Sequence, residues 1–318
     1  MAQIIEALKE KIKGKGIRIV FPESDDNRIL EAAQRLAKED LVKPVLIGNR
    51  KEIENDIALF DVIDPENCDY FNELVQEFVE RREGKASYEE AVELLKSPNY
   101  FGTMLVYTDR AKGLVSGARH STGETVKPAL QIIKTKKGIS KTFGYFIMIR
   151  NNETYIMADC AINPEPDAKM LAEFAVESAK AAQMFGLVPK VALLSFSTNK
   201  SADTDQTKLV RHAVKLAKAK QSGFDIDGEM QFDAAFVPSI GKSKYPDSNV
   251  AGHANTFIFP DLNSGNIGYK IAQRLGNFEA VGPVLAGLNK PVNDLSRGCS
   301  ALDVYNTAII TASQTLIE

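Results

Sequence analysis

The chain has 318 residues, room for two domains of ordinary size, and its 44% hydrophobic and 25% charged residues are the balance of a globular protein. A formal net charge of −3 argues against general binding to nucleic acid or to an anionic membrane. No run approaches the roughly 18 apolar residues that span a bilayer, and the N-terminus has no secretory apolar block. Three cysteines without a CxxC pair exclude a disulfide scaffold and disfavour a structural zinc site, so we expect a cytoplasmic protein.

The first part of the chain predicts short apolar strands, each followed by an amphipathic helix. Ser24 is expected to cap the first of these helices, and Ser87 with Glu90 forms the sequence pattern of a capping box. Strands are expected at 17–21, 44–48 and 114–117, and helices at 70–83, 87–96 and 125–135.

The same alternation continues after about residue 138. Strands are expected at 143–148, 154–157, 190–196, 232–237, 256–259 and 282–288. Helices are expected at 167–185 and 205–220, before Leu275, and from Ser300 to the C-terminus. Strands that alternate with helices predict an α/β fold with largely parallel sheets covered on both faces. Ligands of such sheets bind at the carboxyl ends of the strands, so we expect a site in the polar turns there.

The turn at 291–303 carries Ser296, Arg297 and Asp303 at the start of the final helix. A helix start favours bound anions, and a guanidinium can grip a phosphate with two parallel hydrogen bonds. The spacing of Ser300 and Asp303 equally fits a capping box, in which the carboxylate only completes the helix start. Both interpretations hold together only if the carboxylate keeps a free face.

Two further turns are rich in hydroxyl groups. The turn at 115–127 contains Ser121, Thr122 and Thr125 and ends on Lys127, a composition that suits an anion, although Ser121 or Thr122 can instead cap the following helix. Ser197 and Thr198 follow a buried strand, a common arrangement that is only suggestive.

A fourth polar turn is expected at 263–270, where glycines permit close approach of a ligand or backbone. The patterns GxGxxG, GxxxxGK[ST], HExxH and GxSxG are all absent, so nucleotide hydrolysis, zinc proteolysis and serine hydrolysis have no support.

In chain order, these turns resemble the phosphate acetyltransferase family, and the resemblance covers essentially the whole chain. The runs that carry it are 21–24, 115–118, 120–122, 158–164, 194–198, 227–229 and 232–235. The most specific is the long stretch from 266–270 through 282–283 to Asn293-Asp294-Leu295-Ser296-Arg297-Gly298.

The resemblance implies a two-domain α/β fold like that of the isocitrate and isopropylmalate dehydrogenases. Residues 1–137 and 284–318 would form a discontinuous domain, residues 138–283 an inserted one, and the active site would lie in the interdomain cleft. It also implies a homodimer that acts on coenzyme A, acetyl phosphate and phosphate, with no metal and no cofactor other than coenzyme A as substrate.

Carried over residue by residue, the resemblance makes Asp303, Arg297 and Ser296 the catalytic set. Asp303 would accept the proton of the coenzyme A thiol, and Arg297 and Ser296 would stabilise the phosphate and the acetyl oxygen. Arg82, whose alignment is ambiguous with Arg81, would bind substrate. The other expected substrate-binding residues are Ser121, Thr122, Thr125, Lys127, Ser197 and Thr198.

The sequence departs from the family pattern in two places, and three rival functions remain. Lys127 stands where the family usually has arginine, which removes the planar fork that binds phosphate at two points. Asn199-Lys200 replaces a more usual Lys-Gly, which weakens the role of that loop. The main alternative is a phosphate butyryltransferase; the others are a dehydrogenase, for which no metal-binding aspartate cluster is evident, and a non-catalytic sensor.

Overall fold

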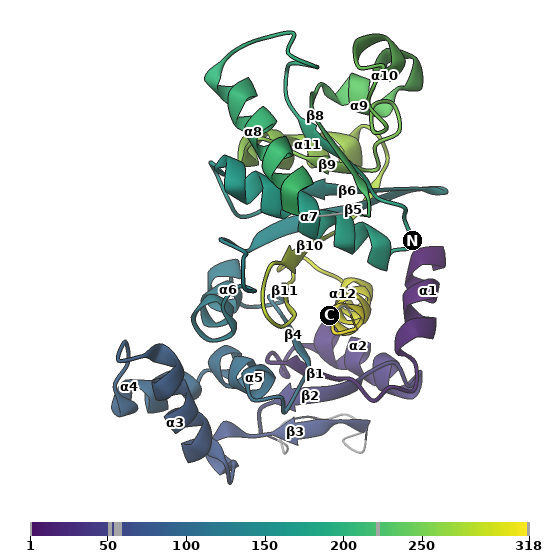
Figure 1. Cartoon of the computed structure of the whole chain (residues 1–318). Coiled ribbons are helices and arrows are strands. Elements are labelled where there is room, and N and C mark those ends of the chain that lie inside the picture. The colour runs from purple at the N-terminus through teal and green to yellow at the C-terminus, as the bar shows by residue number, and fades with distance from the viewer. Residues whose placement is uncertain (1, 50–52, 54–58, 221–222, 317–318) are drawn as a thin grey trace. The chain divides into compact units, whose positions relative to one another are not determined.

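The structure is a computed structural model that describes residues 2–49, 53, 59–220 and 223–316. It divides into two compact units, which we call the terminal unit (Ala2–Lys136 with Leu288–Glu318) and the inserted unit (Lys137–Gly287). The sequence predicts these boundaries at 138 and 284. Each unit is built around its own sheet (Figure 1).

The terminal unit alternates strands and helices from its first residues. Its strands are β1 (Arg18–Phe21), β2 (Lys43–Ile47), β3 (Asp61–Ile63), β4 (Gly113–Ser116) and β11 (Val292–Asp294). Its helices are α1 (Ala2–Ile12), α2 (Asn27–Lys38), η2 (Pro65–Asn67), α3 (Phe71–Arg82), α4 (Tyr88–Leu95), α5 (Pro98–Tyr107), α6 (Thr122–Pro128), η3 (Ala129–Ile133) and α12 (Ala301–Gln314).

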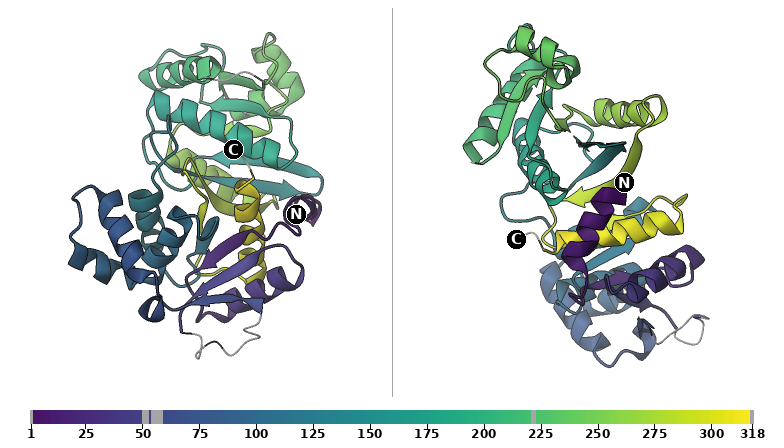
Figure 2. Two further views of the ribbon diagram at one scale, coloured as in Figure 1. Left: turned by 60° about the horizontal axis from the view of Figure 1, so that its bottom comes forward. Right: turned by 90° about the vertical axis from the view of Figure 1, so that its right-hand side faces the viewer.

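The described strands of this unit form one parallel sheet in the order β11-β4-β1-β2-β3. Helices α2 and α12 pack together on one face and α5 lies on the other, so β1 and β4 are buried on both sides (Figure 1). Helix α1 lies against α12 (Figure 2). Parallel pairing places the carboxyl ends of β1, β4 and β11 at one edge of the sheet.

The inserted unit has a mixed sheet in the order β10-β5-β6-β9-β7-β8. The strands are β5 (Phe143–Arg150), β6 (Glu153–Ala158), β7 (Lys190–Leu194), β8 (Asp225–Met230), β9 (Thr256–Ile258) and β10 (Glu279–Ala286). Strands β10, β5 and β6 are antiparallel, and the remaining pairings are parallel.

Helices cover both faces of this second sheet. Helices α7 (Ala168–Met184) and α8 (Asp205–Lys220) pack on one face. A cluster of buried side chains on the other face includes residues of α9 (Phe232–Phe236), and residues of α10 (Pro238–Lys244) and α11 (Leu262–Arg274) pack against it. The predicted α/β class, with mostly parallel sheets flanked by helices, is therefore confirmed. None of the described helices combines the length and apolar character needed to cross a membrane.

Three examples show how local structure departs from the sequence prediction. Ser24 does not cap α2: its hydroxyl donates to the carbonyl of Ile47 at 2.7 Å, and Asp26 caps the helix instead. The segment 232–237, expected as a strand, contains helix α9. The segment 263–270, expected as a turn, lies inside α11.

The capping box of Ser87 and Glu90 is confirmed. The last predicted helix ends at Gln314, and residues 317–318 of that prediction lie outside the described residues.

Candidate active site

The candidate site of the terminal unit forms where two neighbouring parallel strands end. Strand β4 pairs with β11 so that Ser116 lies opposite Asp294, and the loops that follow both strands leave the sheet side by side. The N–H of Leu295 donates to the carbonyl of Ser116 at 2.7 Å and continues this pairing. The loops at 117–121 and 295–300 belong to the two turns that the sequence predicts to bind anions.

A buried carboxylate, that of Glu23, fixes the first loop. Glu23 follows β1 and is 1% exposed. Its Oε2 accepts hydrogen bonds from the N–H groups of Gly117 and Ala118 at 3.0 and 2.9 Å. Its Oε1 accepts from the N–H groups of Arg119 and His120 at 2.9 and 2.8 Å, and His120 Nδ1 lies 2.8 Å from the same oxygen. These contacts offset the desolvation of the carboxylate, so the conformation of the loop depends on Glu23.

Arg28 of α2 ties the first loop to the second. Its Nη2 donates to the carbonyl of Ala118 at 2.8 Å, and its Nη1 donates to the carbonyls of Arg297 and Cys299, both at 2.9 Å. Asp26 accepts from Arg28 Nε at 3.0 Å and from Nη2 at 2.7 Å, which holds the guanidinium in place. The backbone around Arg297 is therefore anchored while its side chain is not.

The side chains of Ser296 and Arg297 are available to a ligand. Both residues are exposed, and the Arg297 guanidinium makes no hydrogen bond or ion pair within the described residues. Among the residues that the structure describes, Ser296 Oγ accepts one hydrogen bond, from the N–H of Gly298 at 3.3 Å. Hydrogen bonds from Ser121 lower the pKa of Glu124, and the charge of Arg297 lowers it further. The guanidinium therefore lies near the first loop.

Asp303 completes the predicted capping box and still keeps one free oxygen. Its Oδ2 accepts the N–H and the hydroxyl of Ser300, both at 2.8 Å, and its own N–H donates to Ser300 Oγ at 3.2 Å. The capping interpretation is therefore confirmed. Asp303 is exposed, and its Oδ1 has no hydrogen-bond partner in the described parts of the chain. The second oxygen meets the condition under which capping and proton transfer are compatible.

Behind this exposed rim lies the buried carboxylate of Asp294, which is 5% exposed. Its Oδ2 accepts the hydroxyl of Thr122 at 2.6 Å. Its Oδ1 and the buried hydroxyl of Thr125 make no hydrogen bond among the described residues. Burial raises the pKa of Asp294 to about 6; the nearby hydroxyls of Thr122 and Thr125 lower it, and the charge of Glu23 raises it.

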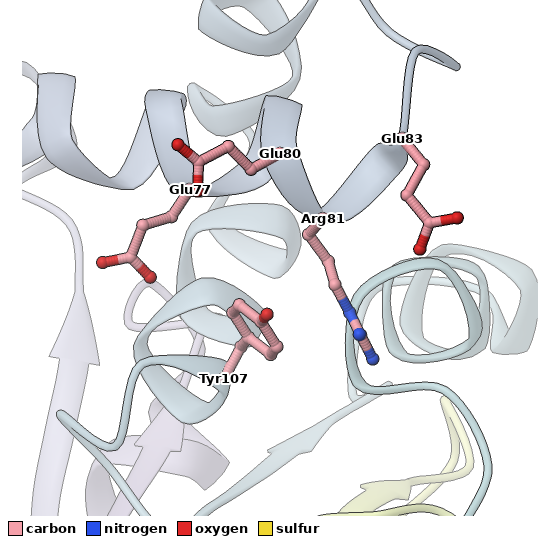
Figure 3. A pocket seen from close by; sticks show the side chains of 5 residues that line it. All are labelled: Glu77, Glu80, Arg81, Glu83 and Tyr107. Carbon is pink, nitrogen blue, oxygen red and sulfur yellow. The ribbon is translucent and has the colours of Figure 1, made fainter.

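The structure separates the two arginines at the end of α3. Arg81 Nε and Nη2 donate to the carbonyls of Ile132 and Ile133 at 2.6 and 3.0 Å, and its guanidinium lies 4.9 Å from the ring centre of Tyr107. Figure 3 shows Arg81 and Tyr107 in a pocket of about 310 Å³ that Glu77, Glu80 and Glu83 also line. Arg82 makes no hydrogen bond within the described residues. Burial of Tyr100 raises the pKa of that residue, and the nearby charge of Arg82 lowers it. The guanidinium still available to a ligand is thus that of Arg82.

The remaining predicted residues differ in accessibility. Lys127 is an exposed residue of α6 with no ion pair among the described residues. Ser121 is exposed, but its hydroxyl donates to Glu124 Oε2 at 2.7 Å. This pair forms the capping box of α6, which confirms the capping alternative for Ser121.

Ser197 and Thr198 belong to the inserted unit and are buried. The Ser197 hydroxyl donates to the buried Glu229 at 2.9 Å and accepts the N–H of Ala202 at 3.0 Å. The Thr198 hydroxyl accepts the N–H of Gln231 at 2.9 Å. Both hydroxyls therefore have structural partners, and a role of this turn in binding remains a prediction.

The inserted unit also carries a groove of about 630 Å³. Two exposed aromatic rings, Phe196 and Phe232, line it together with Phe259 and with the helix cap Asp261. Within the described residues, no group of three or more His, Cys, Asp or Glu side chains is arranged to hold a metal ion.

Sequence patterns assign no role to three residues of this site, Glu23, Arg28 and Asp294. Glu23 and Arg28 act mainly on backbone atoms, and such contacts leave no pattern of side-chain types. The available signal is a carboxylate at the end of a buried strand, as at Asp294, or two residues beyond it, as at Glu23. In an α/β fold this is the position at which a charged group faces the ligand edge.

The fold and this loop pair define an α/β protein with a cationic and a carboxylate group displayed together at the ends of parallel strands. Residues 3–312 match the family described as phosphate acetyl/butaryl transferase. The phosphate acetyltransferase of Staphylococcus epidermidis is 58% identical over 328 residues, which cover 99% of this chain and 100% of that protein. That of Bacillus subtilis is 58% identical over 323 residues, with the same coverage of 99% and 100%.

A solved structure agrees with these sequence relatives. The crystal structure of a phosphotransacetylase from Streptococcus pyogenes is similar with a TM-score of 0.97 and 52% identity, covering 100% of this chain and 99% of that one. The chain therefore belongs to the phosphate acetyl/butaryl transferase family, which confirms the resemblance found from the sequence motifs.

Proposed function

We propose that this protein is a phosphate acetyltransferase, which moves an acetyl group reversibly between coenzyme A and inorganic phosphate. The observation that carries the proposal is the loop at 295–303. It displays the guanidinium of Arg297 and, at the start of α12, the Oδ1 of Asp303, and neither group has a hydrogen-bond partner in the described part of the chain. A cation for the phosphate and a base for the thiol are the two groups that this reaction needs. The names of the relatives support acetyl as the transferred group.

In the direction of thioester synthesis, Asp303 Oδ1 accepts the proton of the coenzyme A thiol. The sulfur then attacks the carbonyl carbon of acetyl phosphate, a carbon–sulfur bond forms, and the carbon–oxygen bond to the phosphate breaks. Phosphate leaves with the electron pair of that bond. The transfer is direct and uses neither a metal nor a covalent enzyme intermediate.

The cationic groups balance the negative charge of this reaction. Arg297 would stabilise both the phosphate and the charge that develops on the acetyl oxygen, to which Ser296 donates a hydrogen bond. Arg82 and Lys127 would bind the phosphate as further cations. The Ser121–Thr125 segment and the Ser197–Thr198 turn complete the proposed binding residues.

The state of the cysteines favours direct transfer over an acetyl-cysteine intermediate. Burial raises the pKa of Cys299, and although the charge of Arg28 lowers it, the net shift is upward. A thiol with a raised pKa is a poor nucleophile at neutral pH. Burial also raises the pKa of Cys160, well above its ordinary value. A variant without Cys68, Cys160 and Cys299 should keep most of its activity and give intersecting initial-rate lines. Parallel lines together with an inactive Cys299→Ala variant would support the intermediate instead.

The reverse reaction tests the proposed activity. Acetyl-coenzyme A should lose its thioester absorbance only when inorganic phosphate is added, and acetyl phosphate should appear in equal amount. Thioester loss without phosphate would indicate a hydrolase. No loss in either case would contradict the proposal.

We further propose that the enzyme is a cytoplasmic homodimer. Three residues of the α11 segment that are four positions apart, Ile267, Ile271 and Leu275, are 57%, 53% and 81% exposed. Apolar side chains at this spacing form one stripe along a helix, and such a stripe favours a protein partner over water. Ile271→Glu should convert the dimer to a monomer in sedimentation experiments, whereas Lys270→Glu, next to the stripe, should not.

A further inference from the structure

The buried carboxylate of Asp294 accepts a hydrogen bond from the hydroxyl of an exposed residue, Thr122. Thr122 is the first residue of α6 and is exposed, whereas Asp294 at the end of β11 is 5% exposed. The Thr122 hydroxyl donates to Asp294 Oδ2 at 2.6 Å. A threonine hydroxyl has only one proton, so this Thr122 offers lone pairs rather than a donor to anything that binds from solvent.

The other side of Asp294 is closely confined. A Cβ atom on Gly117, whose φ is +113°, would collide with Asp294 Oδ1 and with the backbone of Leu295. Oδ1 is buried without a hydrogen-bond partner among the described residues. The carboxyl group therefore has little freedom to turn away from Thr122.

We propose that Asp294 is a positioning residue that sets the direction of the Thr122 hydroxyl proton and thereby the strength with which this loop binds anions. The ionised carboxylate takes the hydroxyl proton as a hydrogen-bond acceptor. The protonated carboxyl group instead donates from Oδ2 to Thr122 Oγ1, which frees the hydroxyl proton to point at a bound anion. This inference rests on the proposed function, in which phosphate binds beside Arg297.

The surroundings of Asp294 place this change within an accessible pH range. Burial raises the pKa of Asp294 to about 6, and the charge of Glu23, from the turn after β1, acts in the same direction. The hydroxyls of Thr122 and Thr125, both on α6, lower it. His120, whose Nδ1 lies 2.8 Å from Glu23, is a further titratable group beside this loop.

Sulfate is the probe for the test, because it keeps its charge in this pH range and can only accept hydrogen bonds. Its dissociation constant is measured by titration calorimetry from about pH 5 to about pH 8. For the unmodified protein we expect binding to weaken about tenfold as the pH rises, the effect of one lost hydrogen bond to an anion. We call this weakening of sulfate binding with rising pH the pH step. Asp294→Asn and Thr122→Val should both remove this step.

Two control variants show whether the titrating group is Asp294 or His120. Thr122→Ser keeps the hydroxyl and should keep the step. His120→Asn removes the imidazole and should also keep the step; its loss in this variant would assign the titration to His120 and overturn the inference. An unchanged step in Asp294→Asn, or pH-independent sulfate binding by the unmodified protein, would overturn it as well.

Failure of the inference can be told apart from failure of the proposed function. Sulfate binding is measured without turnover, so it does not depend on whether the protein transfers acetyl groups. Acetyl transfer without the pH step rejects only the role of Asp294. The step without acetyl transfer supports that role and rejects the proposed reaction.

Discussion

At the scale of single residues, Asp303 serves both as a helix cap and as the proposed base, and the two roles use different oxygens. Asp303→Asn removes the base but leaves an amide oxygen that can still accept from Ser300. Turnover should fall about 100-fold to 10,000-fold, the usual effect of losing a general base. The free energy of unfolding should change by no more than about 1–2 kcal/mol, the range for a helix cap. Steady-state kinetics and thermal unfolding measure the two effects.

Ser300→Ala is the matched control for this prediction. It removes the hydroxyl that bonds to Asp303 and leaves the carboxylate in place. The control should lose about 1 kcal/mol of stability and keep most of its turnover. An active Asp303→Asn variant with a lowered melting temperature would show that Asp303 only caps α12.

The pH dependence of stability reports on Asp294 independently of any ligand. An unfolded aspartate has a pKa of about 3.9, and burial raises the pKa of Asp294 to about 6 in the folded protein. The folded state therefore binds this proton more tightly, and its contribution to stability, present at low pH, is lost as the pH rises from about 4 to about 6.

Asp294→Asn should therefore be more stable than the unmodified protein by about 1–3 kcal/mol near pH 8, with the difference disappearing near pH 4. Urea unfolding at several pH values measures this. Parallel stability curves for the two proteins would show that Asp294 does not titrate in this range.

The lysine at position 127 tests the departure from the family pattern. Lys127 is exposed and has no partner among the described residues. Lys127→Arg should tighten the binding of acetyl phosphate and phosphate by about 1 kcal/mol, the effect of one added hydrogen bond. Michaelis constants for the three substrates measure it, with Lys127→Ala expected to weaken the same two. A change confined to the coenzyme A constant would place Lys127 in the coenzyme site.

At the scale of elements, the turn after β7 is stabilised by the hydrogen bond from the Ser197 hydroxyl to the buried Glu229. Ser197→Ala would leave the buried carboxylate of Glu229 with one donor fewer, so we expect a loss of about 1–3 kcal/mol in the free energy of unfolding. Chemical denaturation measures this loss. Ser195 lies in the same turn but is only partly buried, so Ser195→Ala should change stability less. Equal effects of the two substitutions would contradict the structural role of Ser197.

Elements with a clear period were predictable from the sequence, and short or glycine-containing ones were not. Helix α8 was predicted with its observed ends, because 16 residues give several helical turns of pattern. The five residues of α9 form a short apolar run that fits a strand equally well. In α11 the glycines indicated a turn, but Gly265 serves close packing, since a Cβ there would collide with the carbonyl of Asp159.

The site was predictable where it uses side chains in a local pattern. The capping boxes of Ser121 and Ser300 involve residues three positions apart, so the sequence displays them directly. The contact of Arg28 with Arg297 spans 269 positions and ends on a carbonyl, which every residue has. Long-range contacts to backbone atoms cannot be recognised in a single sequence.

At the scale of the whole molecule, the terminal unit is built from both ends of the chain, and the proposed catalytic residues lie in its last segment. Strand β11 and helix α12 come from the last residues, and they pack against β4, β1 and α2 from the first part. Arg297 and Asp303 therefore depend on the folding of a unit whose two segments are separated by the inserted one. A protein truncated before β11 should lose both the sheet edge and the site.

The proposed acetyl transfer is best tested by the rate of thioester formation from coenzyme A with acetyl phosphate or butyryl phosphate, followed by ultraviolet absorbance. We expect rapid, enzyme-dependent thioester formation with acetyl phosphate and a kcat/KM at least about tenfold lower with butyryl phosphate, since one missing or extra methylene already changes specificity by that factor. A higher kcat/KM for butyryl phosphate would make the protein a phosphate butyryltransferase. No thioester from either substrate would show that the protein is not an acyltransferase of this kind.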